Sequence, residues 1–328
     1  VLNIKKNDEV IVPAFTYIAS VNCISYVGAK PVFCDSDINT GQINVDDIQK
    51  RITKKTKVII VPHLYGNVAN ITKLLKIKKK FNLFIVEDCA EAIGSFYKKK
   101  HVGNFGDIST FSFFGSKTIT TGEGGMICTN NKSFFLKAKK LKGQGLSSSK
   151  KKLYYWHDEI GYNYRMTNIC AALGLAQMKK IDHILKKKII LNKKYMKRLK
   201  QNKIRFLTTD KNSKSSYWLN CLILDSKKKR DKLMNYLKKF RIETRNTFYL
   251  VNEMKMYKEK KSNFPNAKLL SSKGLCLPSF PNISENDFKF IINKINDFLN
   301  KYYEKKNSNT HLFFLRVEWW CRFNMLFS

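Results

Sequence analysis

Acidic residues are scarce in this chain: 25 Asp and Glu stand against 62 Lys and Arg, which gives the 328 residues a formal net charge of +37. Glycine and proline are scarce as well, at 15 and 6 residues, which excludes a collagen-like chain. The hydrophobic content of 43% is too high for a disordered chain and is enough to fill a substantial core. The length predicts roughly two domains.

Closely spaced cysteine pairs are missing too. Eight cysteines are spread along the chain without a C-x-x-C pair: Cys23, Cys34, Cys89, Cys128, Cys170, Cys221, Cys276 and Cys321. This spacing argues against a zinc site and against a disulfide framework, so we expect no metal and mostly buried thiols in a reducing, cytoplasmic compartment. The chain starts at Val1 without a charged-then-apolar leader, and we expect the sequence to begin inside a longer gene.

The positive charge is dispersed rather than collected in one stripe. Short lysine runs recur from Lys54-Lys55 to Lys260-Lys261. A large summed charge attracts polyanions, but this dispersal is typical of a solvated surface, so we expect no nucleic-acid partner.

Large apolar residues crowd the last stretch, 311–328, where Arg316, Glu318 and Arg322 interrupt them. A membrane span needs about 20 predominantly apolar residues, so we expect no membrane partner. We interpret residues 305–328 as an atypical tail, with a frameshift or read-through extension as the working hypothesis.

Short β-rich runs alternate with helical stretches in the first half of the chain. The pattern predicts helices over 19–27 and 71–81, and strands over 9–12, 31–34, 58–61, 83–86, 108–113 and 125–129. Several of these strands lack polar alternation, which is typical of strands buried on both faces, and strands separated by helices pair in parallel. We therefore expect an α/β large domain with a mostly parallel sheet over residues 1–200.

A long helical pattern over 167–199 is expected to link this domain to a second one. Beyond it, the sequence predicts a strand over 217–224 and helices over 229–240 and 285–299. Such a mixture is typical of a smaller α+β domain, which we assign to residues 201–304.

Polar side chains follow the carboxyl ends of three predicted strands, which is where parallel α/β sheets bind ligands. His63 follows the strand 58–61, and Asp88 and Glu91 follow the strand 83–86. Lys117 follows the strand 108–113. Pyridoxal phosphate requires such a pair, because a lysine amine forms a Schiff base with it and an acid pairs with its pyridinium nitrogen. Taken alone, Lys117 reads as a surface amine and Asp88 as a helix cap or turn residue.

Together, eight runs of residues give a specific signal. In their order along the chain, they resemble the DegT/DnrJ/EryC1/StrS sugar aminotransferases over about residues 7 to 300. The resemblance implies a fold-type-I aminotransferase that uses pyridoxal phosphate. The runs are Asp8 to Pro13, Phe15-Thr16-Tyr17, His63 to Gly66, Glu87 to Ala92, Phe111-Ser112-Phe113, Lys117, Thr121 to Gly125 and Gly161 to Arg165.

The resemblance implies roles for the residues around the cofactor. Lys117 matches the Schiff-base lysine, which also moves a proton between the substrate carbon and the cofactor. Asp88 matches the acid on the pyridinium nitrogen. Ser112 matches a hydroxyl donor to the cofactor phosphate, although a strand-end serine also caps turns. Glu91 lies where many members carry a glutamine near the cofactor 3′-oxygen, and its protonation state is open.

Further positions are implied at the edges of the site. Tyr17 matches an aromatic ring that covers one face of the cofactor. Asn163 matches a residue that reaches the phosphate of the partner subunit, which implies a homodimer with composite sites. His63 is either a wall of the active site, placed to contact substrate, or a structural histidine. Arg245 lies where relatives contact the nucleotide sugar, and its guanidinium suits a diphosphate.

The chain also departs from the family pattern. Members normally have several dozen residues before Asp8, including a turn at a helix N-terminus that holds the cofactor phosphate. The N-terminal part of the large domain is therefore expected to be missing, which should lower cofactor affinity. The sequence Leu250-Val251-Asn252 replaces the usual Pro-Val-His. A dehydratase branch of the family carries histidine in place of the lysine, so the retained Lys117 favours transamination.

We therefore expect a pyridoxal-phosphate-dependent transfer of an amino group, with glutamate as donor, to a nucleotide-linked 4-keto-6-deoxy sugar. The runs Tyr155 to Asp158, Tyr162 to Gln177 and Leu277 to Pro281 resemble members that act on GDP-4-keto-6-deoxymannose. The product would serve surface polysaccharide or glycan synthesis. Three alternatives stay open: a dTDP- or UDP-linked 4-ketosugar, a truncated inactive relative, and nucleic-acid binding through the +37 charge.

Overall fold

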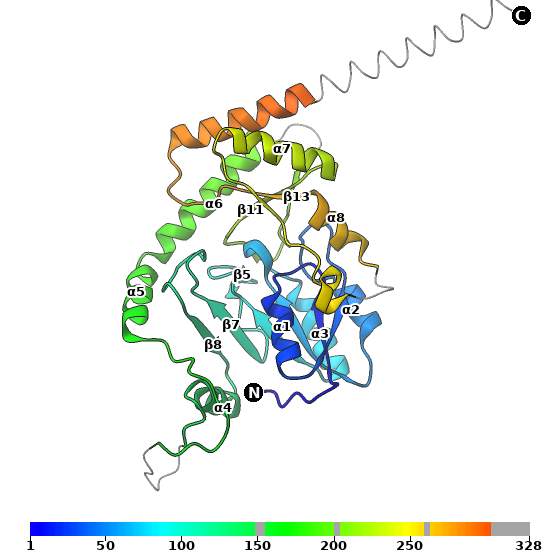
Figure 1. The fold of residues 1–328 in the computed structure, drawn as a ribbon, viewed down its shortest axis with the longest axis vertical. Helices are drawn as coiled ribbons and strands as arrows, with labels where there is room; N and C mark the ends of the chain where they lie inside the picture. The colour runs from blue at the N-terminus through cyan, green and yellow to red at the C-terminus, as the bar shows by residue number, and fades with distance from the viewer. Residues whose placement is uncertain (148–154, 200–203, 259–262, 303–328) are drawn as a thin grey trace, which may run out of the picture.

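A six-stranded sheet forms the centre of the larger part of the molecule (Figure 1). The computed structural model describes residues 1–147, 155–199, 204–258 and 263–302, so the tail expected over 305–328 lies outside the described residues. The strand order is β2-β1-β3-β4-β7-β8. The strands are β1 (Glu9–Pro13), β2 (Lys30–Cys34), β3 (Thr56–Pro62), β4 (Phe84–Asp88), β7 (Ile108–Ser112) and β8 (Gly125–Cys128).

The first five strands in this order are parallel to their neighbours, and only β8 runs antiparallel, to β7. The predicted mostly parallel α/β sheet is confirmed, with one antiparallel edge strand. All the strands predicted for this sheet are present, and their ends lie close to the predicted ones. Turns that contain Gly28 and Asn82 precede β2 and β4, and both residues adopt the positive φ that such turns require.

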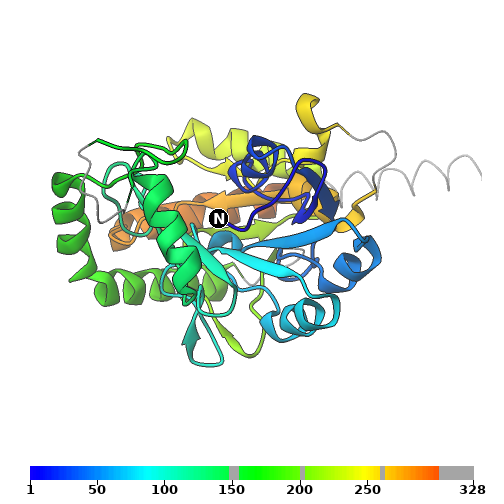
Figure 2. The ribbon, with the colours of Figure 1, turned by 90° about the horizontal axis from the view of Figure 1, so that it is seen from below.

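Helices cover both faces of this sheet. Figure 2 shows α1 (Ala19–Tyr26) on one side and α2 (Val45–Arg51) and α3 (Ile71–Phe81) on the other. Side chains alternate between the two faces along each strand. In β1, Val10 and Val12 join the hydrophobic cluster on the α1 side, whereas Ile11 joins the cluster on the α2 and α3 side. The near-continuous apolar strands thus contribute side chains to two hydrophobic cores, one on each face of the sheet.

Asparagine, threonine and serine residues start most of these helices by capping free backbone N–H groups. The Asn44 side chain accepts from the N–H groups of Asp46 and Asp47 at the start of α2, and the Asn70 side chain accepts from the N–H of Lys73 at the start of α3. Helix α4 (Lys132–Lys142) begins after Asn131 in the same way.

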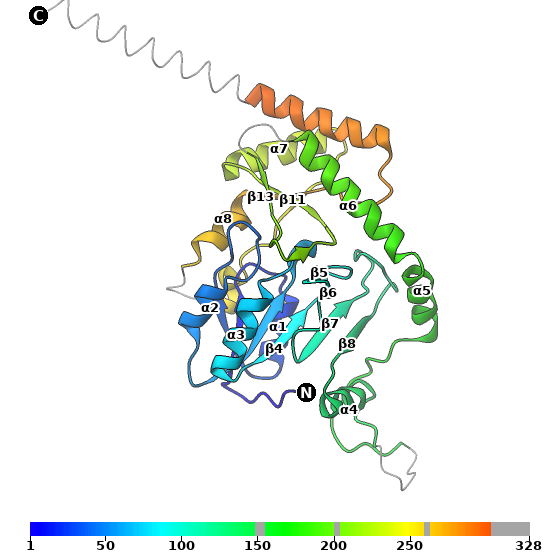
Figure 3. The same ribbon diagram turned by 180° about the vertical axis from the view of Figure 1, so that it is seen from behind.

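The long helical pattern predicted over 167–199 is two helices. The structure breaks it into α5 (Asn168–Met178) and α6 (Ile181–Arg198), because the chain turns at Lys179 and Lys180. Helix α6 then runs from α5 to a second sheet (Figure 3). That sheet is antiparallel with the order β12-β13-β11-β9. Its strands are β9 (Arg205–Phe206), β11 (Asn220–Ile223), β12 (Arg245–Asn246) and β13 (Gly274–Leu277).

Two more helices, α7 (Lys227–Lys239) and α8 (Pro265–Lys273), and a helical stretch over 285–302 complete this part. A third hydrophobic cluster joins α6, α7, β11, β13 and the stretch 285–302. The predicted strand over 217–224 begins only at Asn220, because residues 215–219 cross instead to the loop after β3. A small third sheet pairs β10 (Ser213–Lys214) with the hairpin of β5 (Phe96–Tyr97) and β6 (Lys100–His101). No described helix is long and apolar enough to cross a membrane.

Candidate active site

The candidate site lies at the carboxyl ends of β3, β4 and β7. Strand alternation places the last two side chains of β4 on opposite faces of the sheet. Asp88 shares a face with Val86, two residues earlier, which packs against the hydrophobic cluster on the α1 side. Glu87 shares the opposite face with Ile85, which belongs to the cluster on the α2 and α3 side. The two neighbouring acids therefore serve different environments.

Asp88 faces α1. The Ser20 hydroxyl of α1 donates to Asp88 Oδ2 at 2.6 Å, and the backbone N–H of Ala90 donates to Oδ1 at 3.1 Å. The backbone of Asp88 is fixed as well, because its C=O accepts from the N–H of His63 at 3.0 Å. A half-buried carboxylate with both oxygens held in this way is suited to pair with one cationic ring N–H.

Lys117 lies in the loop that joins β7 to β8. Two backbone hydrogen bonds close this loop: Phe113 N–H donates to Gly124 C=O, and Thr121 N–H donates to Phe113 C=O, both at 2.9 Å. The Lys117 side chain is 13% exposed, and its Nζ lies 3.9 Å from Glu91 Oε1. The same Nζ lies over the Trp218 ring, 4.4 Å from the ring centroid. The lysine side chain is thus largely shielded from solvent rather than spread on the surface.

Glu91 is buried beside this lysine. Its Oε2 accepts the backbone N–H of Tyr65 at 2.8 Å. Burial raises the pKa of Glu91 to about 7, although the Lys117 charge and the Tyr65 hydrogen bond act in the opposite direction. The protonation state left open by the sequence is therefore a balance near neutral pH, and Glu91 is able to hold or release a proton next to Lys117.

Two more predicted cofactor residues lie on neighbouring segments. The Ser112 hydroxyl, at the end of β7, accepts from the N–H of Phe114 at 3.4 Å. Tyr17 follows β1 and is 56% exposed, with its ring 5.8 Å from that of Phe248. Phe248 in turn stacks on Tyr65 at 5.1 Å. Aromatic rings from three distant segments therefore form one wall near the strand ends.

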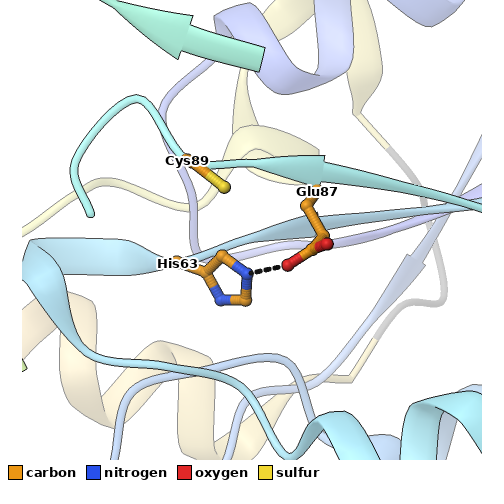
Figure 4. Close-up of side chains that lie close together, drawn as sticks. All are labelled: His63, Glu87 and Cys89. Atoms are coloured by element: carbon orange, nitrogen blue, oxygen red, sulfur yellow. Dashed lines mark hydrogen bonds and ion pairs between the residues drawn. The ribbon is translucent and has the colours of Figure 1, made fainter. Parts of the chain in front are cut away.

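His63 occupies the other face of the sheet. Its Nδ1 accepts from the N–H of Ala69 at 3.3 Å, so Nε2 carries the hydrogen and donates to Glu87 Oε2 at 3.1 Å (Figure 4). Both side chains are fully buried. The structure thus favours the structural reading of His63 over its reading as a wall of the active site that contacts substrate.

Glu87 gathers further donors from the loop after β6. Its oxygens accept the backbone N–H groups of Gly103, Phe105 and Gly106 at 2.6–2.8 Å. Burial alone would raise the pKa of Glu87, but the His63 contact and these backbone donors outweigh it and lower the pKa below its ordinary value. The carboxylate is therefore a fixed, charged anchor for this loop.

Cys89 lies close to His63 and Glu87, and ligand atoms of the three residues lie within 4.8 Å of one another (Figure 4). Such a set resembles a metal-binding trio. However, both His63 nitrogens and both Glu87 oxygens already have hydrogen-bond partners, and burial raises the pKa of the Cys89 thiol well above its usual value. The donor set is that of a neutral thiol beside a completed hydrogen-bond network, which does not favour a cation.

The two remaining predicted residues lie apart from Lys117. Asn163 is exposed in the segment between α4 and α5, where it forms an isolated β-bridge with Gly143. Arg245 is 72% exposed on β12, and its guanidinium donates to the Glu243 carboxylate at 2.9 Å. Their described contacts are thus local ones, with open surface around both side chains.

Sequence reasoning missed Ser20, which holds Asp88, and Trp218, which covers Lys117. Neither gives a local signal, since a serine in a helix and a tryptophan before a strand are ordinary. Trp218 is about a hundred residues from Lys117 in the chain, and only folding brings the two together.

Comparison with known proteins shows to which family of enzymes this chain belongs. The model of the DegT/DnrJ/EryC1/StrS aminotransferase family matches residues 1–296. A GDP-perosamine synthase of Escherichia coli O157:H7 is 48% identical over 297 residues, which cover 90% of this chain and 80% of that protein. A GDP-perosamine synthase of Vibrio cholerae is 42% identical over 303 residues, which cover 91% of this chain and 82% of that protein.

Solved structures agree. The PLP form of a Streptococcus pneumoniae protein described as a sugar aminotransferase superposes with a TM-score of 0.85 at 28% identity, covering 92% of this chain and 83% of that one. The fold and the matches define a pyridoxal-phosphate-dependent aminotransferase of fold type I, as predicted. The chain belongs to the DegT/DnrJ/EryC1/StrS aminotransferase family.

The residues present fit pyridoxal phosphate. Lys117 offers a shielded amine, Asp88 offers a held carboxylate on the same face of the sheet, and Ser112 offers a hydroxyl at the next strand end. The buried hydroxyl of Thr118, next to Lys117 in the chain, has no hydrogen-bond partner among the described residues. An amine, an anion and free hydroxyl groups at one sheet edge are the donor set that an aldehyde, a pyridinium and a phosphate need.

Proposed function

We propose that this chain transfers an amino group from glutamate to the 4-keto carbon of GDP-4-keto-6-deoxymannose and so forms GDP-perosamine for surface polysaccharide or glycan synthesis. The ion pair of Lys117 with Glu91, at the same sheet edge as the held carboxylate of Asp88, carries the aminotransferase part. The GDP-perosamine synthases that are 48% and 42% identical to this chain support the choice of sugar.

Pyridoxal phosphate, when bound, supplies an aldehyde that accepts the amino group and a ring that withdraws electrons from the reacting carbon. The protein directs this chemistry through its side chains. Asp88 would place a negative charge at the ring nitrogen, and Ser20 holds that carboxylate in place. Lys117 Nζ would hold the aldehyde and would move the proton of the reacting carbon. The buried position excludes water from the amine.

Glu91 is suited to exchange that proton with Lys117, since its oxygen lies 3.9 Å from Nζ and its pKa of about 7 matches neutral solution. A general acid or base is most effective when its own pKa lies near the working pH. We also propose that Ser112 binds the cofactor phosphate, that Tyr17 covers the ring, and that Arg245 binds the diphosphate of the sugar nucleotide.

The test is turnover of the purified chain with pyridoxal phosphate and glutamate on GDP-4-keto-6-deoxymannose, with product detected by mass spectrometry. Lys117→Ala should lose roughly 10²–10⁴-fold in turnover, because the proton-moving group is gone. Lys50→Ala, at an exposed lysine of α2, is the matched control and should retain turnover. Faster turnover on a dTDP- or UDP-linked ketosugar would replace the proposed acceptor with that nucleotide. No turnover on any of them would support an inactive relative.

A second copy of the chain is part of the proposal. The segment around Asn163 exposes several large apolar side chains, among them Trp156 (57%), Ile160 (91%) and Ile169 (85%). Exposed apolar surface of this kind is typical of an interface. A homodimer in which Asn163 reaches the cofactor phosphate of the other subunit accounts for this exposed polar residue among apolar ones.

Mixing two inactive variants tests the composite site. Lys117→Ala and Asn163→Ala should each be weak alone, and a mixture should recover part of the turnover because some dimers then contain one intact site. Absence of recovery, together with a monomeric mass in sedimentation, would remove the homodimer from the proposal.

We further propose the division into a large domain over 1–200 and a small one over 201–304. The separate hydrophobic cluster around β11 and β13 supports it. The cytoplasmic setting is also a proposal, supported by seven described cysteines that are all free thiols.

A further inference from the structure

Trp218 stands out because it touches the reactive lysine without being part of any motif. Its indole ring lies over Lys117 Nζ at 4.4 Å, within the range of a cation–π contact. Its ring N–H donates to the C=O of Ser116, the residue before the lysine, at 3.0 Å. The side chain is 8% exposed and belongs to the α1-side core. One rigid ring therefore contacts both the amine of Lys117 and the backbone that carries it.

The backbone of Trp218 is fixed by the turn after β3. Ser216 N–H donates to Gly66 C=O at 3.3 Å, and the Ser215 hydroxyl donates to the same oxygen at 2.9 Å. Gly66 has φ +91, and a Cβ there would lie 2.8 Å from Trp218 N. Only glycine allows the two segments to approach so closely. The segment is thereby held from the side of the large sheet.

Lys188 of α6 holds the same backbone from the opposite side. Its Nζ donates to the C=O groups of Trp218 and Ser279, both at 3.1 Å. The residue is 5% exposed and has no carboxylate ion-pair partner within the described part of the chain. Burial without such a partner lowers the pKa of Lys188 to about 8. A buried amine of this kind is costly, which makes a merely space-filling role a poor explanation for it.

The contact belongs to a polar seam along one face of α6. Asn192, one turn after Lys188, donates to Asn220 Oδ1 at 2.9 Å, and the Tyr195 hydroxyl donates to Pro278 C=O at 3.0 Å. Positions four and seven apart lie on one helix face. Helix α6 therefore fixes the start of β11 and the end of β13, and with them the segment of Trp218.

We propose that Trp218 and Lys188 are positioning residues for Lys117, with Lys188 fixing the backbone of Trp218 and the indole ring fixing the amine and favouring its cationic form. The proposal deepens the proposed function, on which it rests through the identity of Lys117 as the reacting amine. The charged groups near this amine are Glu91, at 3.9 Å, and Asp88, which acts on Glu91. The variants below leave both unchanged.

The experiment follows the reactivity of the Lys117 amine in the cofactor-free chain. Trace acetylation over a range of pH, read at the Lys117 peptide by mass spectrometry, reports the fraction of neutral amine and needs neither cofactor nor sugar. Trp218→Leu removes the ring, and the midpoint of the profile should move to lower pH by roughly 0.5–1 unit, or about three- to tenfold in reactivity below the midpoint. Trp218→Phe keeps a ring and should retain most of the effect.

Lys188→Met should move the midpoint in the same direction, although Lys188 does not touch Lys117. The double variant Trp218→Leu/Lys188→Met should move no further than Trp218→Leu, because Lys188 acts through the ring. Lys186→Met, at an exposed lysine on the same helix, is the matched control and should leave the profile unchanged. Circular dichroism checks that each variant is folded.

An unchanged Lys117 midpoint in folded Trp218→Leu overturns the proposal, and so does an additive shift in the double variant. If Lys188→Met does not fold, the comparison of Trp218→Leu with Trp218→Phe still decides the role of the ring. A wrong sugar acceptor leaves all of these results intact, so failure of the proposed function is recognised separately.

Discussion

Replacing Glu91 by glutamine removes a buried acid whose proton affinity the site strongly alters. The pKa of Glu91 rises from 4.5 to about 7, chiefly because the carboxyl group is buried. The folded state then binds this proton more tightly than the unfolded state. The stability that the protonated acid contributes is fully present below pH 4.5 and is lost as the pH rises through about 7.

A shift of this size corresponds to about 3 kcal/mol of unfolding free energy. The side chain is 6% exposed, so little of this is lost to solvent screening. A glutamine side chain at this position would be neutral at every pH and would still offer an oxygen to the Tyr65 N–H. We therefore expect Glu91→Gln to be close to the wild type at pH 5 and more stable than it by about 2–3 kcal/mol at pH 8.

Urea unfolding of the cofactor-free chain at several pH values measures this difference. Glu253→Gln, at an exposed glutamate, is the matched control and should follow the wild type at every pH. A stability difference between Glu91→Gln and the wild type that does not change with pH would refute the reasoning, because it would mean that folding leaves the pKa of Glu91 unchanged. If the stability advantage of Glu91→Gln became smaller at high pH, the Lys117 charge would outweigh burial in setting the pKa of Glu91.

Two further substitutions test the parts of the fold that support the site. Glu87→Gln should lower the unfolding free energy by roughly 2–3 kcal/mol, because a single amide oxygen replaces two charged oxygens that accept from buried donors. Urea unfolding measures this loss. A loss smaller than that of the Glu253→Gln control would contradict the prediction. Gly66→Ala should cost about 2 kcal/mol or more, because φ is +91 and the new Cβ meets Trp218 N at 2.8 Å. Gly115→Ala, with open space around its Cβ, is its control in thermal unfolding, and equal midpoints would show that the turn relaxes.

Local pattern was enough to predict the sheet, whereas the roles of Asp88 and Lys117 were predicted from the family resemblance. Apolar strands such as Thr56–Pro62 are bounded by turn residues, and hydrophobic strands separated by amphipathic helices pair in parallel whatever lies elsewhere in the chain. The strand ends then had to meet at one edge, which placed Asp88 and the loop that carries Lys117 at the same edge of the sheet. The break between α5 and α6 was not predicted, since the apolar spacing continues across it.

Tertiary structure alone decided what surrounds the predicted site residues. Alternation separates Glu87 from Asp88, but only the packing of α1 and the contact of its Ser20 show that Asp88 lies on the α1 side. Among the lysines of α6, Lys188 differs from the rest by burial, which depends on residues next to β11 and β13. The sequence by itself therefore determined the α/β fold and, through the family resemblance, the cofactor. The surroundings of the reactive lysine, with Trp218 over it and an acid titrating beside it, depend on contacts between distant segments that no local pattern contains.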